Sequence, residues 1–119
     1  MVQIITKKVE FELAKLDINK GEMLDNEGKP LMEKHHAILK RLSFGEKNGL
    51  EEECTEIRMN GNVPSAKMNT ARYATMAILR STVTSTTPLT TPKQVDDLPQ
   101  EVGILLFNSF VELNTIHPK

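Results

Sequence analysis

The sequence predicts an α+β fold that is mostly α, with a short N-terminal β element packed on a bundle of about four helices. Two observations lead to this prediction. β-branched and alternating apolar residues dominate residues 2–13, whereas helix-start signals and helical apolar spacing recur in the later segments. At 119 residues the chain is expected to form one domain, residues 1–119, that buries about two-thirds of its unfolded surface.

Residues 1–29 are predicted to form the N-terminal β element and a loop. Val9, Phe11 and Leu13 alternate with polar residues, which is the spacing of a strand with one buried face. Val9, Leu13 and Leu16 also fit helical spacing, but the β-branched stretch at 2–6 favours the strand. Turn signals at 19–21 and 25–28 then predict a short hairpin followed by a loop.

Residues 30–80 are predicted to form the helical core. Pro30 is expected to open a first helix that runs to about Leu42, with apolar residues on one face. Ser43-Phe-Gly-Glu46 matches a capping box, so a second helix should begin there. Leu50, Cys54 and Ile57 follow at helical spacing, which predicts that this helix continues to about Ile57.

A break at 60–64 separates the second helix from a third, which Ser65 or Asn69 caps and which runs to about Arg80. Residues 81–91 are nearly all Ser, Thr and Pro, a composition typical of an extended connector. Thr91-Pro-Lys-Gln94 is a further helix start and opens a C-terminal helical segment, 92–116.

The last helix of this segment carries two apolar stripes. A small protein has one hydrophobic core, which can bury only one of them. The larger stripe is predicted to face the core, and it consists of Val102, Leu105, Leu106, Phe110, Leu113 and Ile116. Ile104, Phe107 and Val111 form the smaller stripe, which needs another cover. We therefore predict that these three residues bind a partner chain or a second copy.

Composition narrows the classes of function. The formal net charge is −1, and the chain has no Trp and one Tyr, which disfavours a dedicated nucleic-acid binder. The one cysteine cannot form an internal disulfide, so a reducing compartment is favoured. The N-terminus lacks a signal-peptide pattern and no apolar run reaches the roughly 20 residues of a membrane span, so we expect a soluble, cytoplasmic protein without a membrane partner.

Three groups of reactive side chains are candidates for a chemical site. His35 and His36 with Glu33 could offer metal ligands, but adjacent rings diverge on a helix. Cys54 lies among glutamates that would raise its pKa, which favours a core thiol over a nucleophile. The glutamates themselves are typical of a solvated surface. We therefore predict no enzyme activity, no catalytic or metal site and no cofactor.

Cationic residues leave nucleic-acid binding as an alternative, because they could assemble a stripe that contacts phosphates. Two groups qualify: Lys7, Lys8, Lys15, Lys34, Lys40 and Arg41, and on another helix Arg72 and Arg80.

Two sequence patterns resemble a known family. Leu42-Ser-Phe-Gly-Glu-Lys-Asn48 leads into a Glu-rich helix, a Gly-containing break and an Ala- and Leu-containing helix. Leu98-Pro-x-x-Val102-Gly103-x-Leu105-Leu106 closes on Glu112-Leu113-Asn114. This order, over roughly residues 30–114, resembles the small tail assembly chaperones of long-tailed phages and related archaeal viruses or proviruses.

The resemblance implies a non-enzymatic chaperone that covers the apolar helices of a tape measure protein while the tail tube assembles. It implies the tape measure protein as partner, the tail tube protein as a second candidate, self-association into a homo-oligomer and a location in the host cytoplasm. Two alternatives from other classes stay open: a structural tail or connector subunit of the virion, and a small nucleic-acid-binding regulator.

Overall fold

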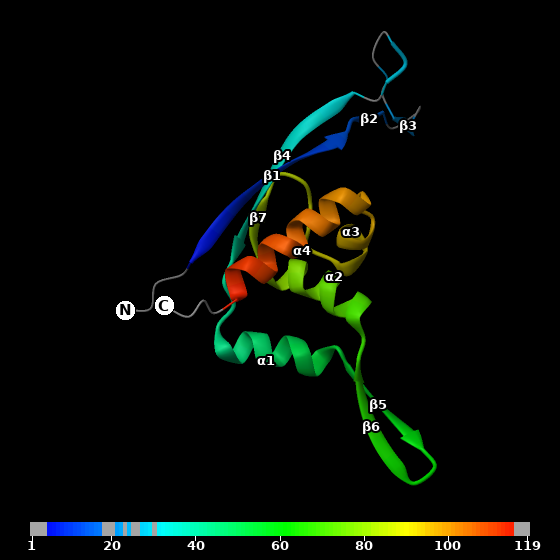
Figure 1. The fold of residues 1–119 in the computed structure, drawn as a ribbon. Helices are drawn as coiled ribbons and strands as arrows, with labels where there is room; N and C mark the ends of the chain where they lie inside the picture. Colours follow the sequence, from blue (N-terminus) through cyan, green and yellow to red (C-terminus); the bar gives the residue numbers. More distant parts are fainter. Residues whose placement is uncertain (1–4, 18–20, 23, 25–26, 30, 116–119) are drawn as a thin grey trace.

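Strands and helices contribute about equally to the part of the chain that the structure describes. The structure is a computed structural model, and it describes residues 5–17, 21–22, 24, 27–29 and 31–115. The strands are β1 (Thr6–Ala14), β2 (Leu16–Asp17), β3 (Gly21–Glu22), β4 (Met32–Lys40), β5 (Thr55–Asn60), β6 (Val63–Met68) and β7 (Thr82–Ser85). The helices are α1 (Phe44–Glu53), α2 (Thr70–Ser81), α3 (Pro92–Asp96) and α4 (Gln100–Asn114). Together they span 61 × 45 × 23 Å (Figure 1).

The main sheet is antiparallel and three-stranded, with the order β1-β4-β7. β1 pairs with β4 from Thr6 opposite Lys40 to Ala14 opposite Met32. Alternation along β1 points Val9 and Phe11 into the core and leaves Glu10 exposed on the opposite face. The predicted N-terminal strand is therefore confirmed over Thr6–Ala14, and the part of the prediction at 2–4 lies outside the described residues. The strand belongs to a sheet larger than a local hairpin.

The prediction of a helix over 30–42 is wrong, because this segment forms β4. Its residues favour helix intrinsically, and its apolar residues fit both periods. Without a neighbouring strand, β1 would leave the backbone N–H and C=O groups along its edges without hydrogen-bond partners. The ladder with β4 runs along the whole of β1 and provides partners for the groups of one edge. Pairing also buries Ala37 and Leu39 completely on the core face. Tertiary pairing thus outweighs a helix propensity of a few tenths of a kcal/mol per residue.

The second predicted helix begins correctly and ends too late. Ser43 caps α1 with its hydroxyl, and Glu46 accepts a hydrogen bond from the Ser43 amide at 3.0 Å, which confirms the capping box. The helix ends at Glu53, and residues 55–68 form a hairpin of β5 and β6 around Gly61-Asn62. Gly61 adopts a φ of +66°, as a tight turn requires. Asn69, one of the two predicted caps, opens α2.

The predicted connector 81–91 contains a strand. β7 pairs with β4, and Val83 is the extra residue of a bulge where the register shifts between Ile38 and Leu39. Leu89 is buried in the core, so the segment is anchored beyond the strand as well. Thr91 then caps α3 in a second capping box with Gln94, as predicted.

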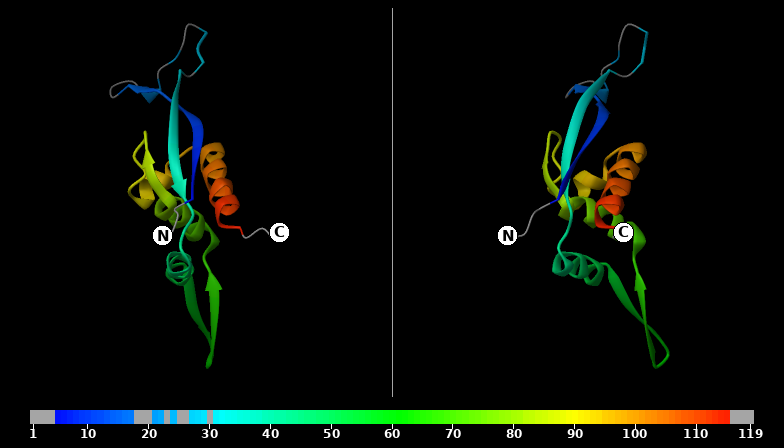
Figure 2. Two further views of the ribbon diagram at one scale, coloured as in Figure 1. Left: turned by 90° about the vertical axis from the view of Figure 1, so that its left-hand side faces the viewer. Right: turned by 60° about the vertical axis from the view of Figure 1, so that its left-hand side comes forward.

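The prediction of a mostly helical bundle is therefore wrong. The described residues form one three-stranded sheet and two two-stranded ribbons. Helices α2, α3 and α4 gather on one side of the larger sheet, and α1 lies beyond its lower end (Figure 2). No described helix is both long and apolar enough to cross a membrane.

Helix α4 joins two apolar clusters. The first lies between the sheet, α2, α3 and α4, and it includes Val102 and Leu106. The second lies between α1, α2 and α4, and it includes Phe110. The larger predicted stripe of α4 thus faces the core at these three residues, with Leu113 partly buried. Leu105 departs from the prediction with 41 % of its surface exposed, and Ile116 lies outside the described residues.

We expect Leu106→Ala to lower the free energy of unfolding by about 2–5 kcal/mol, because the side chain is fully buried and its loss leaves a cavity. Leu105→Ala is the matched control on the same helix, and it should cost less, about 1 kcal/mol, because 41 % of the surface of this residue stays exposed to solvent. Urea denaturation of both variants measures the difference. Equal losses would contradict the orientation of α4.

The capping box of α1 predicts a pH dependence. The Ser43 amide, and then the Lys40 ammonium 3.0 Å away, lower the pKa of Glu46 from 4.5 to about 2. The unfolded chain therefore takes up this proton first as the pH falls, so the stabilising contribution is present above pH 4.5 and lost toward pH 2.

Glu46→Gln keeps an acceptor for the Ser43 amide and removes the titration. Over the window between pH 4.5 and about 2, the natural chain should lose more stability than Glu46→Gln, as measured by urea midpoints at each pH. Parallel losses in the two proteins would show that the box does not titrate in this way.

Candidate protein-binding site

An open apolar groove lies between α2, α3 and α4. Its volume is about 350 Å³. Ile78 of α2 and Val95 of α3 form part of its floor, since both are buried in the core cluster beside the sheet. Polar side chains contribute at the rim, where Thr75 donates a hydrogen bond to Asp96 at 2.5 Å. The groove is therefore an open and mainly apolar part of the surface.

Helix α4 supplies one whole wall of the groove. The lining residues of this wall are Gln100, Gly103, Ile104, Phe107 and Asn108. They follow the i, i+3, i+4, i+7, i+8 spacing of one helix side, so the wall runs along two turns, about 12 Å. A Cβ atom built at Gly103 would meet no atom within 4 Å, so the space beside this residue is open.

The three predicted partner-binding residues lie on this side of α4. Ile104 and Phe107 line the groove, and Ile104 has 51 % of its surface exposed. Phe107 is partly buried and packs on both core clusters, with its ring 6.0 Å from that of Phe110. Val111 is 45 % exposed and lies one turn beyond the groove. The structure thus gathers the three residues beside one groove, with Phe107 also serving the core.

A second uncovered apolar surface lies on the β5–β6 hairpin. Every residue of both strands is exposed, and the hairpin projects from the rest of the chain (Figure 1). Register places Ile57 opposite Ala66 and Met59 opposite Pro64 on one face. We call this face the apolar hairpin face, and its members are Ile57, Met59, Pro64, Ala66 and Met68. Glu56, opposite Lys67, and Arg58, opposite Ser65, lie on the other face.

This surface was not predicted from the sequence. The helical spacing of Leu50, Cys54 and Ile57 predicts instead that Ile57 lies on the apolar side of a helix. Leu50 and Cys54 are buried as predicted, but Ile57 is 76 % exposed. The signal that could have found the surface is the alternation of Glu56, Ile57, Arg58 and Met59 before a Gly-Asn pair, which is typical of a hairpin strand.

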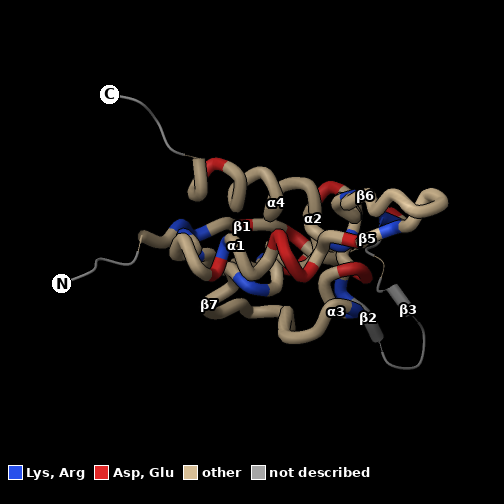
Figure 3. Tube along the Cα trace, turned by 90° about the horizontal axis from the view of Figure 1, so that it is seen from below, with Lys and Arg blue, Asp and Glu red and all other residues tan. Residues whose placement is uncertain are grey.

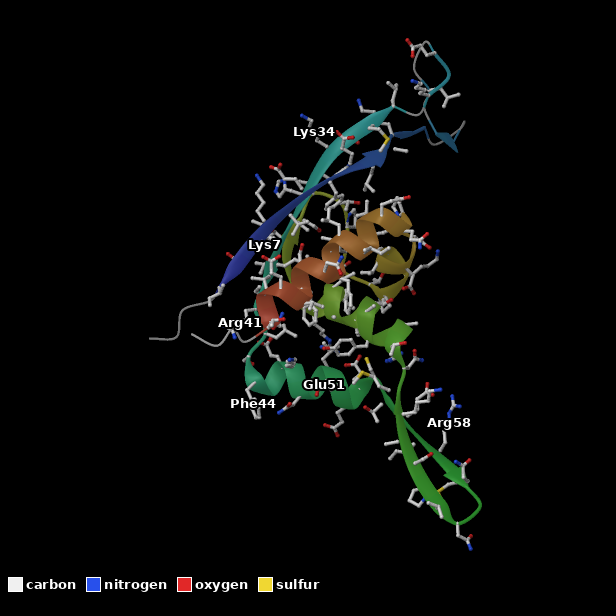
Figure 4. All side chains as sticks on the ribbon, in the orientation of Figure 1. Lys7, Lys34, Arg41, Phe44, Glu51 and Arg58 are labelled. Carbon is white, nitrogen blue, oxygen red and sulfur yellow. The ribbon has the colours of Figure 1, made fainter. Side chains whose placement is uncertain are left out.

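Phe44 is a further exposed apolar side chain. It begins α1, and 85 % of its surface is exposed. Figure 4 shows it at the left-hand end of that helix. It therefore belongs to a separate part of the surface, and the groove does not include it.

The histidine pair lies on a strand, so its rings point to opposite faces of the sheet. His35 is on the core face, where its ring stacks on Phe11 with centroids 6.2 Å apart and Nδ1 lies 3.0 Å from the Thr86 hydroxyl. Glu33 approaches His35 Nε2 at 3.6 Å. His36 faces Glu10 across the outer side of the sheet. Among the described residues, no group of three or more His, Cys, Asp and Glu is arranged to hold a metal ion.

Cys54 is buried among the residues of the second cluster, as the core-thiol prediction requires. Burial is the largest cause that raises the pKa of its thiol, and the charge of Arg72 opposes it. The direction of this pKa shift agrees with the prediction, but its main cause differs, because Glu53 is a smaller contributor than burial.

The cations proposed as a phosphate-binding stripe are in large part paired with carboxylates. Acidic and basic positions are interspersed over the elements in Figure 3, and Lys34 and Arg41 lie toward opposite ends of β4 in Figure 4. The pairs formed by these cations include Lys7–Glu112 at 2.8 Å, Lys40–Glu46 at 3.0 Å, Arg80–Glu53 at 2.7 Å and Arg72–Glu53 at 3.6 Å. This pairing reduces the positive field that a nucleic acid would require.

Comparison of the chain with protein-family models, with curated proteins and with solved structures finds no match.

Burial of Cys54 predicts slow chemical labelling. In the folded protein, a thiol-specific disulfide reagent should react far more slowly than with the urea-unfolded chain, because the thiol is covered and its raised pKa reduces the thiolate fraction. The measurement is the rate of absorbance change with and without denaturant. Comparable rates in both states would contradict the placement of Cys54.

Proposed function

We propose that this chain is a non-enzymatic assembly chaperone that covers an apolar helix of a partner protein. The groove between α2, α3 and α4 is the observation that carries this proposal. It is open, mainly apolar and continued along α4 by the exposed side chain of Val111. A partner side chain seated there would bury Ile104 and complete the cover of Phe107.

The dimensions of the groove suit a helix. A wall of two helical turns can contact side chains at i, i+3, i+4 and i+7 of a partner, which is the usual pattern when an amphipathic helix binds a groove. Binding through apolar side chains alone tolerates different partner sequences, since it imposes no fixed hydrogen-bond geometry. Such tolerance is what a protein needs if it covers many turns of a long helix.

The family resemblance supplies the identity of the partner. It makes the tape measure protein of a long-tailed phage or related virus the proposed client, and the tail tube protein a second one. Long apolar helices without cover aggregate, so a chaperone would hold them until the tube assembles around them. We place this activity in the host cytoplasm.

A test compares two substitutions on α4 that differ in their position relative to the groove. Ile104→Asp places a charge in the groove and should reduce recovery of co-expressed tape measure protein in the soluble fraction at least about tenfold. Leu105→Asp is the matched control, since Leu105 is similarly exposed but lies outside the groove, and it should retain near-normal recovery. Urea denaturation of each variant confirms that both fold.

Equal recovery of the tape measure protein with and without this chain would overturn the proposal. The location of the chain then separates the alternatives. A structural subunit would be present in purified virions, whereas a chaperone is absent from them. A nucleic-acid-binding regulator would bind DNA with an affinity that falls steeply as salt increases.

A further inference from the structure

The outer edge of β5 carries backbone groups positioned for pairing. The Asn69 amide donates to the Cys54 carbonyl at 2.8 Å, and the two residues lie in line with the β5–β6 register. Antiparallel ladders alternate between bonded and non-bonded pairs, so Glu56 and Arg58 direct their backbone groups toward β6. Thr55, Ile57 and Met59 therefore direct theirs away from β6.

The outer edge of β6 is different. By the same alternation Pro64 and Ala66 face outward there, and Pro64 has no amide hydrogen to donate. Proline at this place is a common means of protecting an edge strand from further pairing. The hairpin thus has one edge that can accept another strand and one edge that is blocked.

The hairpin is also poorly supported by the rest of the chain. Every residue in it is exposed, and a two-stranded ribbon in water is marginally stable at best. A third and fourth strand would add ladder hydrogen bonds and lateral packing for side chains such as Ile57 and Met59, which are 76 % and 62 % exposed.

We propose that β5 pairs antiparallel with β5 of a second copy of this chain, around a two-fold axis at Ile57. Ile57 then lies opposite Ile57 of the second copy, and Thr55 lies opposite Met59. These are the residues whose backbone groups face outward, so the ladder can close with standard geometry. The two hairpins form one four-stranded sheet in the order β6-β5-β5-β6, with the blocked β6 edges outermost.

The charged residues of β5 favour this register over the neighbouring registers of the same strand pair. Glu56 of each copy lies opposite Arg58 of the other, so attractive pairs form on both sides of the axis. The neighbouring registers of the β5–β5 pair that also keep the outward-facing backbone groups opposite one another would place either Arg58 opposite Arg58 or Glu56 opposite Glu56. Like charges directly opposite one another are destabilising. Within one chain Glu56 and Arg58 already lie 3.2 Å apart, so the four charges alternate in sign both along and across the strands.

The pairing has a geometric consequence for the apolar hairpin face. Because the strands are antiparallel and each hairpin projects from its own body, the two bodies lie at opposite ends of the shared sheet (Figure 1). Residues directly opposite one another share a face, so the two apolar hairpin faces join on one side. Neither groove on α4 takes part, and the contact does not depend on the identity of any client protein.

Two charge reversals test the contact in the full chain. Glu56→Arg makes both positions on β5 positive, and Arg58→Glu makes both negative. Each variant alone should dimerise at least about tenfold more weakly than the natural chain in sedimentation equilibrium. An equimolar mixture should recover the dimer, because the positive β5 of one variant then lies opposite the negative β5 of the other. Recovery also shows that both variants are folded.

A disulfide measures the register directly. With Cys54→Ser in the background, Ile57→Cys should give a covalent dimer on mild oxidation, because bonded antiparallel pairs place Cα atoms about 5.5 Å apart. Val63→Cys is the matched control: it is 67 % exposed on the same hairpin but lies on β6, and it should remain largely uncoupled. A natural chain that stays monomeric, a dimer indifferent to both reversals, or equal coupling at both cysteines would overturn the proposal.

Discussion

The burial of α4 against two clusters at once is the constraint on which the remaining structure depends. Leu106 packs in the cluster beside the sheet, and Phe110 packs in the cluster formed with α1 and α2. Asn114 at the end of the helix accepts a hydrogen bond from the Leu42 amide at 2.9 Å, which ties α4 to the link between β4 and α1. The sheet and the helical layer are therefore held together by α4 together with α2, which also contributes residues to both clusters.

This arrangement explains why a groove exists beside α4. One side of the helix serves both clusters, so the opposite side has no element of the described chain to cover it. Ile104 and Val111 stay exposed there, while Phe107 at the boundary contacts both clusters and the groove. Phe107 lies partly in the core and partly on the surface. Its ring can contribute to a binding site and stay rigid, because it packs against the rings of Tyr73 and Phe110.

Charge in this protein is organised mainly by short-range pairing. Glu53 of α1 forms ion pairs with Arg72 and Arg80 of α2. The two helices joined by these pairs also contribute to the second apolar cluster. Each exposed pair contributes little to stability by itself. Their main effect is on specificity, because they fix which faces of the two helices meet. On the hairpin the same two signs of charge alternate along β5, where Glu56 pairs with Arg58 and also accepts a hydrogen bond from the Asn69 side chain at 3.3 Å.

Local signals in the sequence were sufficient wherever the interaction spans only a few residues. The caps at Ser43, Asn69 and Thr91 depend on side chains that reach backbone amides within one turn. Residue types therefore predicted the capping box at Ser43 and the helix start at Thr91, and they narrowed the cap of α2 to Ser65 or Asn69. The alternation in β1 also predicted a strand, although Val9, Leu13 and Leu16 fit helical spacing as well. The smaller stripe of α4 was also identified, because two apolar stripes on one helix exceed what a single core covers.

Only the tertiary structure decided between helix and strand at 30–42 and 55–60, and between connector and strand at 82–85. Residues such as Ile38 and Ile57 fit both periods, and the deciding term is the pairing partner, which lies far away in sequence for β4 and across a turn for β5. The sequence by itself therefore determined the caps, the first strand and the doubly apolar α4. The sheet order and the projecting hairpin follow from backbone pairing that no single segment encodes.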